Sequence, residues 1–312
     1  MKSITFPKTL KKGDKIAIIS PAGSVEESQL EQGLELIKQQ GYEPVFGKYL
    51  FTKYSYGYNY SGTEKQRIHD LNWALNDDNI AAIWASRGGY GCQHLLRHIK
   101  LNKFKENPKW YIGYSDNTVI QSFLLKKGFA SIHGQTIKTS SFGVIKEGYD
   151  GIFDIMKGSL PKYLVEANLL NKNGNAEGIL VGGNLALVYA LLGTNFSFDF
   201  KDKILFIEDI GENFYALDRM LMSLELAGVF RKIKGLIIGG MINMGSEKDN
   251  PNYEESYDAF AYQLISERLK KYHFPTLFGF PNGHIYDNRP LIIGSKIRLT
   301  VGEKNKVETL IF

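Results

Sequence analysis

The stretch YIGYSDNT, residues 111–118, passes from an apolar run through a glycine to a serine and an aspartate. Residues 109–113 predict a buried strand, and residues 116–127 predict a helix immediately after it. Ser115 therefore stands at the corner between the two. One interpretation is that its hydroxyl caps the helix. The other is that it is a nucleophile, with the following backbone N–H groups directed toward a developing oxyanion.

The segments before this corner repeat the same alternation of strand and helix. Ser24 and Glu27 predict a capping box for a helix that ends at Gln40. Apolar strands alternating with amphipathic helices are typical of a parallel sheet with helices on both faces. The strands are predicted over 14–23 and 81–86, and a further helix over 63–75.

A second set of elements follows the polar, glycine-rich passage NLLNKNGNAEG, residues 168–178. We therefore predict an α/β protein of two domains: a Rossmann-like, parallel-sheet domain over 1–155 and a smaller α/β domain over 179–312, joined by a linker over 156–178. The elements predicted in the second domain are a turn and helix in LVGGNLALVYALLG, strands over 203–209, 235–240 and 275–280, helices over 215–227 and 254–271, and a hairpin over 295–312 with its turn near 302–305.

Composition excludes several classes of function. The net charge of +5 is spread along 312 residues without a run of five like charges, so we expect no nucleic-acid partner. No apolar stretch reaches the roughly 20 residues that span a bilayer, and the first 15 residues lack a signal-peptide core. We therefore expect a cytoplasmic protein without a membrane partner.

No cofactor or metal is expected either. The chain lacks both the G-x-G-x-x-G and the G-x-x-x-x-G-K-[ST] patterns of nucleotide sites. His94 and His98 have the spacing of a helical metal pair, but neither the glutamate of H-E-x-x-H nor a clear third ligand accompanies them. Cys92, the single cysteine, has no clear base beside it and is interpreted as a packed residue.

Three reactive side chains fall at the ends of predicted strands, where open α/β sheets bind their ligands. These are Ser115, Glu208 and His284. A serine becomes a nucleophile when a base removes its proton, and the base needs a partner that fixes its tautomer. His133, which also ends a strand, is the alternative base, and Glu208 is alternatively a surface acid. GYSDN matches the G-x-S-x-G nucleophile elbow only in part, since Asn117 replaces the second glycine.

The glycines of RGGYG, residues 87–91, have two interpretations. They either permit a tight turn or bring backbone N–H groups close to a ligand.

Six motifs, in this order along the chain, resemble those of the LD-carboxypeptidase family of serine peptidases. They are GDKIAIISPAG, ASRGGYG, YIGYSDNT, GGNLALVYALLGT, LFIEDIGENFYALDRML and FPNGHIYDNRPLIIG. The resemblance covers nearly the whole chain, from about residue 10 to residue 300.

The resemblance implies a Ser-Glu-His triad, with Ser115 as nucleophile, Glu208 as the acid and His284 as general base. It further implies an oxyanion hole formed by the backbone amides of Gly89 and Asp116, and a site between the two domains of a homodimer. The implied substrate is a small peptide, the peptidoglycan tetrapeptide, which loses its terminal D-Ala. Because an arginine fork suits a free carboxylate, we expect Arg87 and Arg289 to bind the substrate.

Two other functions stay open. The microcin C immunity peptidases belong to the same family and hydrolyse an aminoacyl-nucleotide bond with the help of stacking aromatic residues. This chain has no tryptophan after Trp110, which disfavours that function. A two-domain protein that binds a small ligand without chemistry is the third hypothesis, and it predicts that Ser115 does not react with a serine-directed phosphonate.

Overall fold

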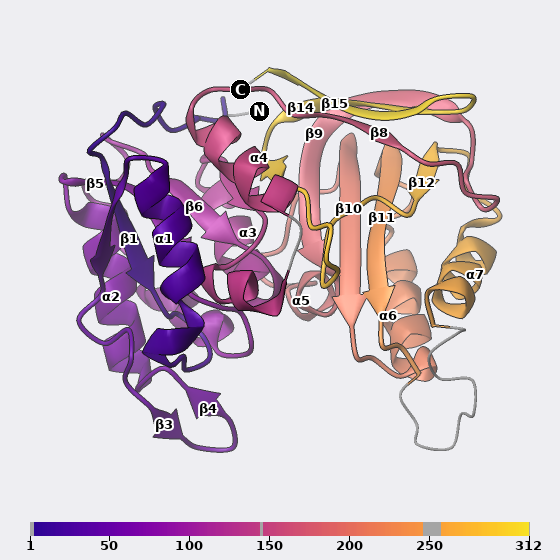
Figure 1. The fold of residues 1–312 in the computed structure, drawn as a ribbon. Helices are drawn as coiled ribbons and strands as arrows, with labels where there is room; N and C mark the ends of the chain where they lie inside the picture. The colour runs from indigo at the N-terminus through magenta and orange to yellow at the C-terminus, as the bar shows by residue number, and fades with distance from the viewer. Residues whose placement is uncertain (1–2, 144–145, 246–256, 312) are drawn as a thin grey trace. The chain divides into compact units, whose positions relative to one another are not determined.

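The computed structural model describes residues 3–143, 146–245 and 257–311. The chain forms two compact units (Figure 1). The first comprises residues 1–159 together with 289–292, and the second comprises residues 160–288 and 293–312. A short segment near the C-terminus therefore belongs to the unit that the N-terminal half builds.

The first unit is built on a six-stranded sheet in the order β13-β7-β6-β5-β1-β2. The pairs between β2 and β7 are all parallel. The interior strands are buried at nearly every position, as in a sheet that is covered on both faces. The strands are β1 (Lys15–Ile19), β2 (Glu43–Phe46), β5 (Ile80–Ala85), β6 (Trp110–Gly113), β7 (Ser131–His133) and β13 (Leu291–Ile293).

Helices and one small hairpin complete the first unit. The hairpin pairs β3 (Tyr54–Ser55) with β4 (Asn59–Tyr60). The helices are α1 (Glu31–Gln39), α2 (Glu64–Asn76), α3 (Thr118–Lys126) and α4 (Lys146–Met156), with 3₁₀ turns η1 (Glu27–Gln29), η2 (Cys92–His98), η3 (Ser115–Asn117) and η4 (Ile137–Phe142). The buried side chains of Trp84, Trp110 and Phe104 belong to the core of this unit.

The second unit has a seven-stranded mixed sheet in the order β12-β11-β10-β9-β14-β15-β8 (Figure 1). Its first four strands are parallel, and the rest pair antiparallel. The strands are β8 (Lys162–Val165), β9 (Gly174–Asn184), β10 (Lys203–Ile210), β11 (Gly235–Ile242), β12 (Thr276–Phe278), β14 (Lys296–Val301) and β15 (Asn305–Ile311). The helices are α5 (Leu185–Ala190), α6 (Phe214–Leu226) and α7 (Tyr257–Leu269).

These elements confirm the predicted α/β class and most of the predicted strands and helices. The start of the helix predicted over 254–271 lies outside the described residues. The capping box at Ser24 and Glu27 is wrong: Glu26 and Gln29 form the box, and it begins η1 instead of a long helix. The predicted linker over 156–178 contains β8 and the first part of β9, and the second unit begins at residue 160. The glycines and asparagines of 168–178 are typical of a loop, yet β9 begins at Gly174 and pairs with β14.

Candidate active site

Ser115 occupies a strained corner at the end of β6. Its φ is +61°, one of three positive values among the non-glycine residues of the described chain. Side chains with a Cβ rarely adopt this left-handed region, and when they do the residue is often at a functional site. The N-cap of η3 is Tyr114 and that of α3 is Asn117, so Ser115 is not a helix cap. The capping interpretation of Ser115 is therefore wrong.

The glycine loop after β5 lies directly against this corner. A Cβ on Gly88 would lie 2.8 Å from the Ser115 Cβ and 2.9 Å from its Oγ, so only glycine fits. Gly89 has a φ of +117°, and a Cβ there would lie 2.1 Å from the Tyr58 hydroxyl. The glycines of RGGYG therefore do more than permit a turn: they bring the backbone next to Ser115. Sequence reasoning missed Tyr58, whose only signal was the alternation of tyrosines in YSYGYNY.

Gly89 and Asp116, whose amides form the predicted oxyanion hole, both belong to the first unit. Ser115 and Asp116 are the first two residues of η3, so their N–H groups have no partner inside that turn. Within the described part of the chain, the Gly89 N–H donates to no backbone carbonyl. Gly89 follows Gly88, which packs against Ser115, and Asp116 directly follows Ser115, so both N–H groups belong to segments beside this serine.

The Asp116 side chain points into the protein. It is buried, and its Oδ2 accepts a hydrogen bond of 2.7 Å from the backbone N–H of Cys92. Burial raises the pKa of Asp116 to about 6, although the hydrogen bond from Cys92 and the charge of Arg67 oppose the shift. The carboxylate therefore ties the η3 turn to the start of η2.

Glu208 and His284 form a hydrogen-bonded pair in the second unit. Glu208, near the carboxyl end of β10, is fully buried, and its Oε2 lies 2.8 Å from the His284 Nδ1. Because an ionised carboxylate only accepts hydrogen bonds, the proton belongs on Nδ1, and Nε2 then carries the basic lone pair. A Cβ on Gly283 would lie 2.8 Å from the Glu208 Oε2, so glycine at this position lets the histidine loop approach.

The pKa of His284 reflects opposing effects. Burial lowers it, but the charge and hydrogen bond of Glu208, together with the charge of Asp209, raise it above the ordinary value. A carboxylate that orients an imidazole and stabilises its protonated form is the environment of a general base.

Asp209, next along β10, has a different role. Its Oδ1 accepts from the Asn184 Nδ2 at 2.8 Å, and its Oδ2 accepts from the Ala186 N–H at 2.9 Å. Burial and then the charge of Glu208 raise the pKa of Asp209 to about 7. Successive strand residues point to opposite faces. Asp209 therefore fixes the start of α5, whereas Glu208 faces the histidine.

The alternative reactive residues are placed in packed surroundings. His133 is fully buried in β7, and its Nδ1 lies 3.2 Å from the Gln121 Oε1. Cys92 is buried as predicted, and burial raises the pKa of its thiol. Among the residues that the structure describes, no group of three histidine, cysteine or acidic side chains could hold a metal ion.

The two predicted substrate-binding arginines are half-buried and belong to the first unit. The Arg87 Nη1 donates to the Ser24 carbonyl at 3.0 Å, while its backbone carbonyl accepts from Asn117. Arg289 opens the segment 289–292, five residues beyond His284.

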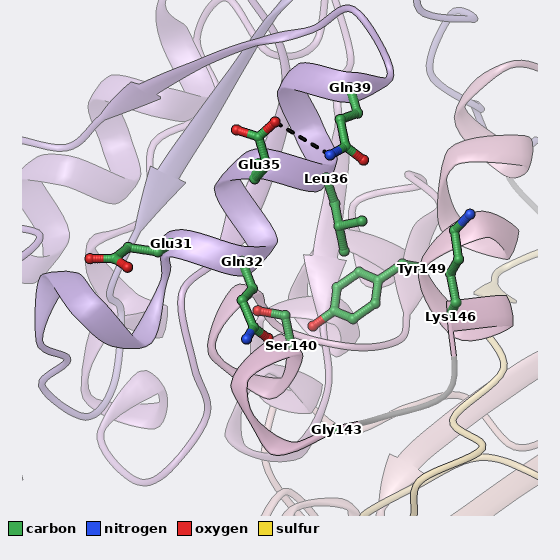
Figure 2. A pocket seen from close by; sticks show the side chains of 9 residues that line it. All are labelled: Glu31, Gln32, Glu35, Leu36, Gln39, Ser140, Gly143, Lys146 and Tyr149. Carbon is green, nitrogen blue, oxygen red and sulfur yellow. Dashed lines mark hydrogen bonds between the residues drawn. The ribbon is translucent and has the colours of Figure 1, made fainter.

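A separate hollow of about 560 Å³ lies between α1, η4 and α4 (Figure 2). Its lining carries two carboxylates, one of which, Glu35, accepts a hydrogen bond of 3.3 Å from Gln39. None of the predicted site residues lines it. The lining residues are Glu31, Gln32, Glu35, Leu36, Gln39, Ser140, Gly143, Lys146 and Tyr149.

Two family models match this chain, one in its N-terminal part and one in its C-terminal part. Residues 16–134 match the model of the LD-carboxypeptidase N-terminal domain, and residues 177–299 match that of the C-terminal domain. These matches define the class of the protein as a peptidase, and thus a hydrolase. The chain belongs to the LD-carboxypeptidase family.

Three similar proteins illustrate the range of the family. A probable murein peptide carboxypeptidase of Bacillus subtilis is 30% identical over 312 residues, covering 96% of this chain and 93% of the relative. The microcin C7 self-immunity protein of Escherichia coli is 26% identical and covers 94% and 92%, respectively. The crystal structure of a muramoyltetrapeptide carboxypeptidase from Oxalobacter formigenes superimposes with a TM-score of 0.83 at 27% identity, covering 95% of this chain and 98% of that one.

In the described ranges, every helix is too short or too polar to cross a membrane.

Proposed function

We propose that this protein is a serine LD-carboxypeptidase that releases the terminal D-Ala from the tetrapeptide of recycled peptidoglycan. The observation that carries the proposal is the buried Glu208 carboxylate 2.8 Å from the His284 Nδ1. The strained Ser115 corner supports it, as does the likeness to the muramoyltetrapeptide carboxypeptidase.

In the proposed mechanism, the His284 Nε2 takes the proton of the Ser115 hydroxyl, and the Ser115 Oγ attacks the carbonyl carbon before the terminal D-residue. The amides of Gly89 and Asp116 bind the resulting oxyanion. His284 then protonates the leaving amine, and water hydrolyses the acyl-enzyme with His284 again as base. Glu208 holds the imidazole and stabilises its charged form. The reaction requires His284 of the second unit to reach Ser115 of the first.

We assign the free carboxylate of the substrate to Arg87 and Arg289. A guanidinium binds a carboxylate through two parallel hydrogen bonds, which suits an enzyme that must recognise the end of a peptide. We further propose a cytoplasmic homodimer, as the family resemblance implies. Light scattering of the purified protein tests the dimer, and fractionation of the producing cells tests the location.

Replacement of Ser115 by alanine tests the nucleophile. We expect Ser115→Ala to fold normally and to lose D-Ala release by at least about 10⁴-fold, because no other hydroxyl takes its place. The measurement is mass spectrometry of the products from a small panel of tetrapeptides. D-Ala release at the parental rate by the variant would contradict the triad.

A second candidate function is hydrolysis of an aminoacyl-nucleotide amide, because the microcin C7 self-immunity protein matches over most of the chain. A side-by-side assay with a muropeptide and an aminoacyl sulfamoyl adenylate separates the two functions. Faster turnover of the adenylate would replace our proposal by this one. Recovery of both compounds unchanged, with no phosphonate bound to Ser115, would instead favour a non-catalytic binding protein.

A further inference from the structure

The side chain of Asp116 links two segments of the first unit, the η3 turn and the start of η2. The backbone N–H of this residue is one of the proposed oxyanion donors. Its side chain, only 1% exposed, accepts the Cys92 N–H at 2.7 Å. The proposed reaction uses only the Asp116 amide, and the Asp116 carboxylate takes no part in its chemical steps.

Arg67 of α2 binds the glycine loop at Gly91, one residue before Cys92. Arg67 is 3% exposed, and its Nη1 donates to the carbonyls of Pro21 at 2.7 Å and Gly91 at 2.8 Å. The guanidinium also lies over the Tyr60 ring, 4.9 Å from its centroid. A Cβ on Gly91 would lie 2.6 Å from the Arg67 Nη1, so the contact depends on glycine at this position.

The two anchors fix the loop on the C-terminal side of Gly88 and Gly89. Gly88 packs against Ser115, and Gly89 is the next residue along the chain. A shift at Gly91 or Cys92 would therefore displace Gly88 and Gly89. Buried charged groups are costly to fold, and apolar residues of similar volume would commonly be at least as stable. Their use here therefore calls for a role beyond stability.

We propose that Asp116 and Arg67 are positioning residues that hold the loop over 88–92 so that the Gly89 and Asp116 amides face the same oxyanion. The inference rests on the proposed function, since it concerns the geometry of that oxyanion hole. Neither side chain needs to touch the substrate.

The test measures how fast Ser115 reacts with a fluorophosphonate, alongside kcat and KM for the tetrapeptide. The His284 Nε2 takes the hydroxyl proton, the Ser115 Oγ forms the bond to phosphorus as fluoride leaves, and the phosphoryl oxygen occupies the proposed oxyanion hole. We expect Asp116→Ala to slow both phosphonylation and kcat by about 10- to 100-fold, with little change in KM. Asp116→Asn keeps an oxygen that accepts the Cys92 N–H and should restore the rate to within about threefold of the parent.

Asp70→Ala is the matched control. Asp70 of the same unit is likewise buried, at 3% exposed, and its Oδ2 accepts the Tyr49 N–H at 2.7 Å, whereas Asp116 accepts from the glycine loop. We expect this variant to lose stability to urea as Asp116→Ala does, and yet to react with the phosphonate at the parental rate. Equal slowing in both variants would show a general loss of structure and overturn the proposal.

Arg67→Met tests the second anchor and serves if Asp116→Ala does not fold. Arg67→Met should also slow phosphonylation about 10-fold. The double variant with Asp116→Ala should slow it by less than the product of the two single effects, because both side chains act on one loop. A parental rate in either folded variant overturns the positioning roles while leaving the proposed function intact. Absence of any phosphonylation in the parent would instead refute the proposed function.

Discussion

At the scale of single residues, backbone conformation and close approach define the serine corner. Ser115 adopts a positive φ that costs conformational energy. Gly88 lacks a Cβ, which would otherwise clash with the Ser115 side chain. In the second unit, Gly283 gives Glu208 comparable room. The reactive side chains are thus positioned by neighbours that have no side chain.

Replacing Glu208 by glutamine tests the pair with His284. We expect Glu208→Gln to lower kcat by about 10⁴-fold, since the amide no longer stabilises the charged imidazole. The carboxylate raises the pKa of His284. The base must be neutral to act, so the rate rises with pH through that pKa, and the variant should shift this rise to lower pH. The measurement is kcat/KM between pH 4 and pH 9.

Glu177→Gln provides the control, because Glu177 is a carboxylate of β9 that pairs with Arg298 and not with a histidine. Its pH profile should match that of the parent. An unchanged pH profile in Glu208→Gln would argue against the assigned roles of both Glu208 and His284.

At the scale of elements, a local irregularity between β10 and β11 shapes the loop that carries His284. The register of the two strands shifts between Ile207 and Asp209, next to Glu208. Opposite this point, the Gly240 N–H donates to the Asn282 carbonyl at 3.0 Å, and the Asn288 Nδ2 donates to the Gly283 carbonyl at 2.7 Å. Bulges commonly redirect side chains near active sites.

Gly239→Ala tests this arrangement. A Cβ at Gly239 would lie 2.4 Å from the Asn282 carbonyl oxygen, so the loop must move. We expect kcat to fall about 10- to 100-fold, because displacement by about 1 Å is enough to disturb a catalytic base. Gly302→Ala is the control, since a Cβ there meets nothing within 4 Å in the described structure. Full activity in Gly239→Ala would show that the loop does not depend on this contact.

At the scale of the whole molecule, a buried carboxyl group with a raised pKa occurs in each unit. Asp116 belongs to the first unit, with a pKa of about 6, and Asp209 to the second, with a pKa of about 7. A carboxyl whose folded-state pKa exceeds its unfolded value favours folding when protonated. That stability is complete below the unfolded pKa of 3.8 and is lost as the pH rises through the folded pKa.

Urea unfolding at several pH values tests this linkage for Asp116, whose carboxyl is faced by Arg67, Cys92 and His94. The three tryptophans of the chain all lie in the first unit, so their fluorescence follows that unit. Between pH 4 and pH 8, we expect the free energy of unfolding of Asp116→Asn to rise relative to the parent by on the order of 3 kcal/mol. The same pH dependence in both proteins would contradict the raised pKa.

Sequence alone determined the α/β class and most strands and helices, because apolar runs such as residues 81–86 and 203–209 are local signals. It also singled out Ser115, Glu208 and His284 as candidates, since each follows a predicted strand and open α/β sheets bind ligands at the carboxyl ends of their strands. The partner of Asp209 was not predicted, because Asn184 lies 25 residues away in the sequence.

Only the tertiary structure decided the features that join distant segments. The positive φ of Ser115 is supported by packing against Gly88, and the Asp116 carboxylate acts through Cys92, 24 residues away. The short strand β13 returns from the C-terminal region to the first sheet, beside β7. These contacts are non-local, so no window of sequence contains both partners, and only the closed fold fixes which groups meet.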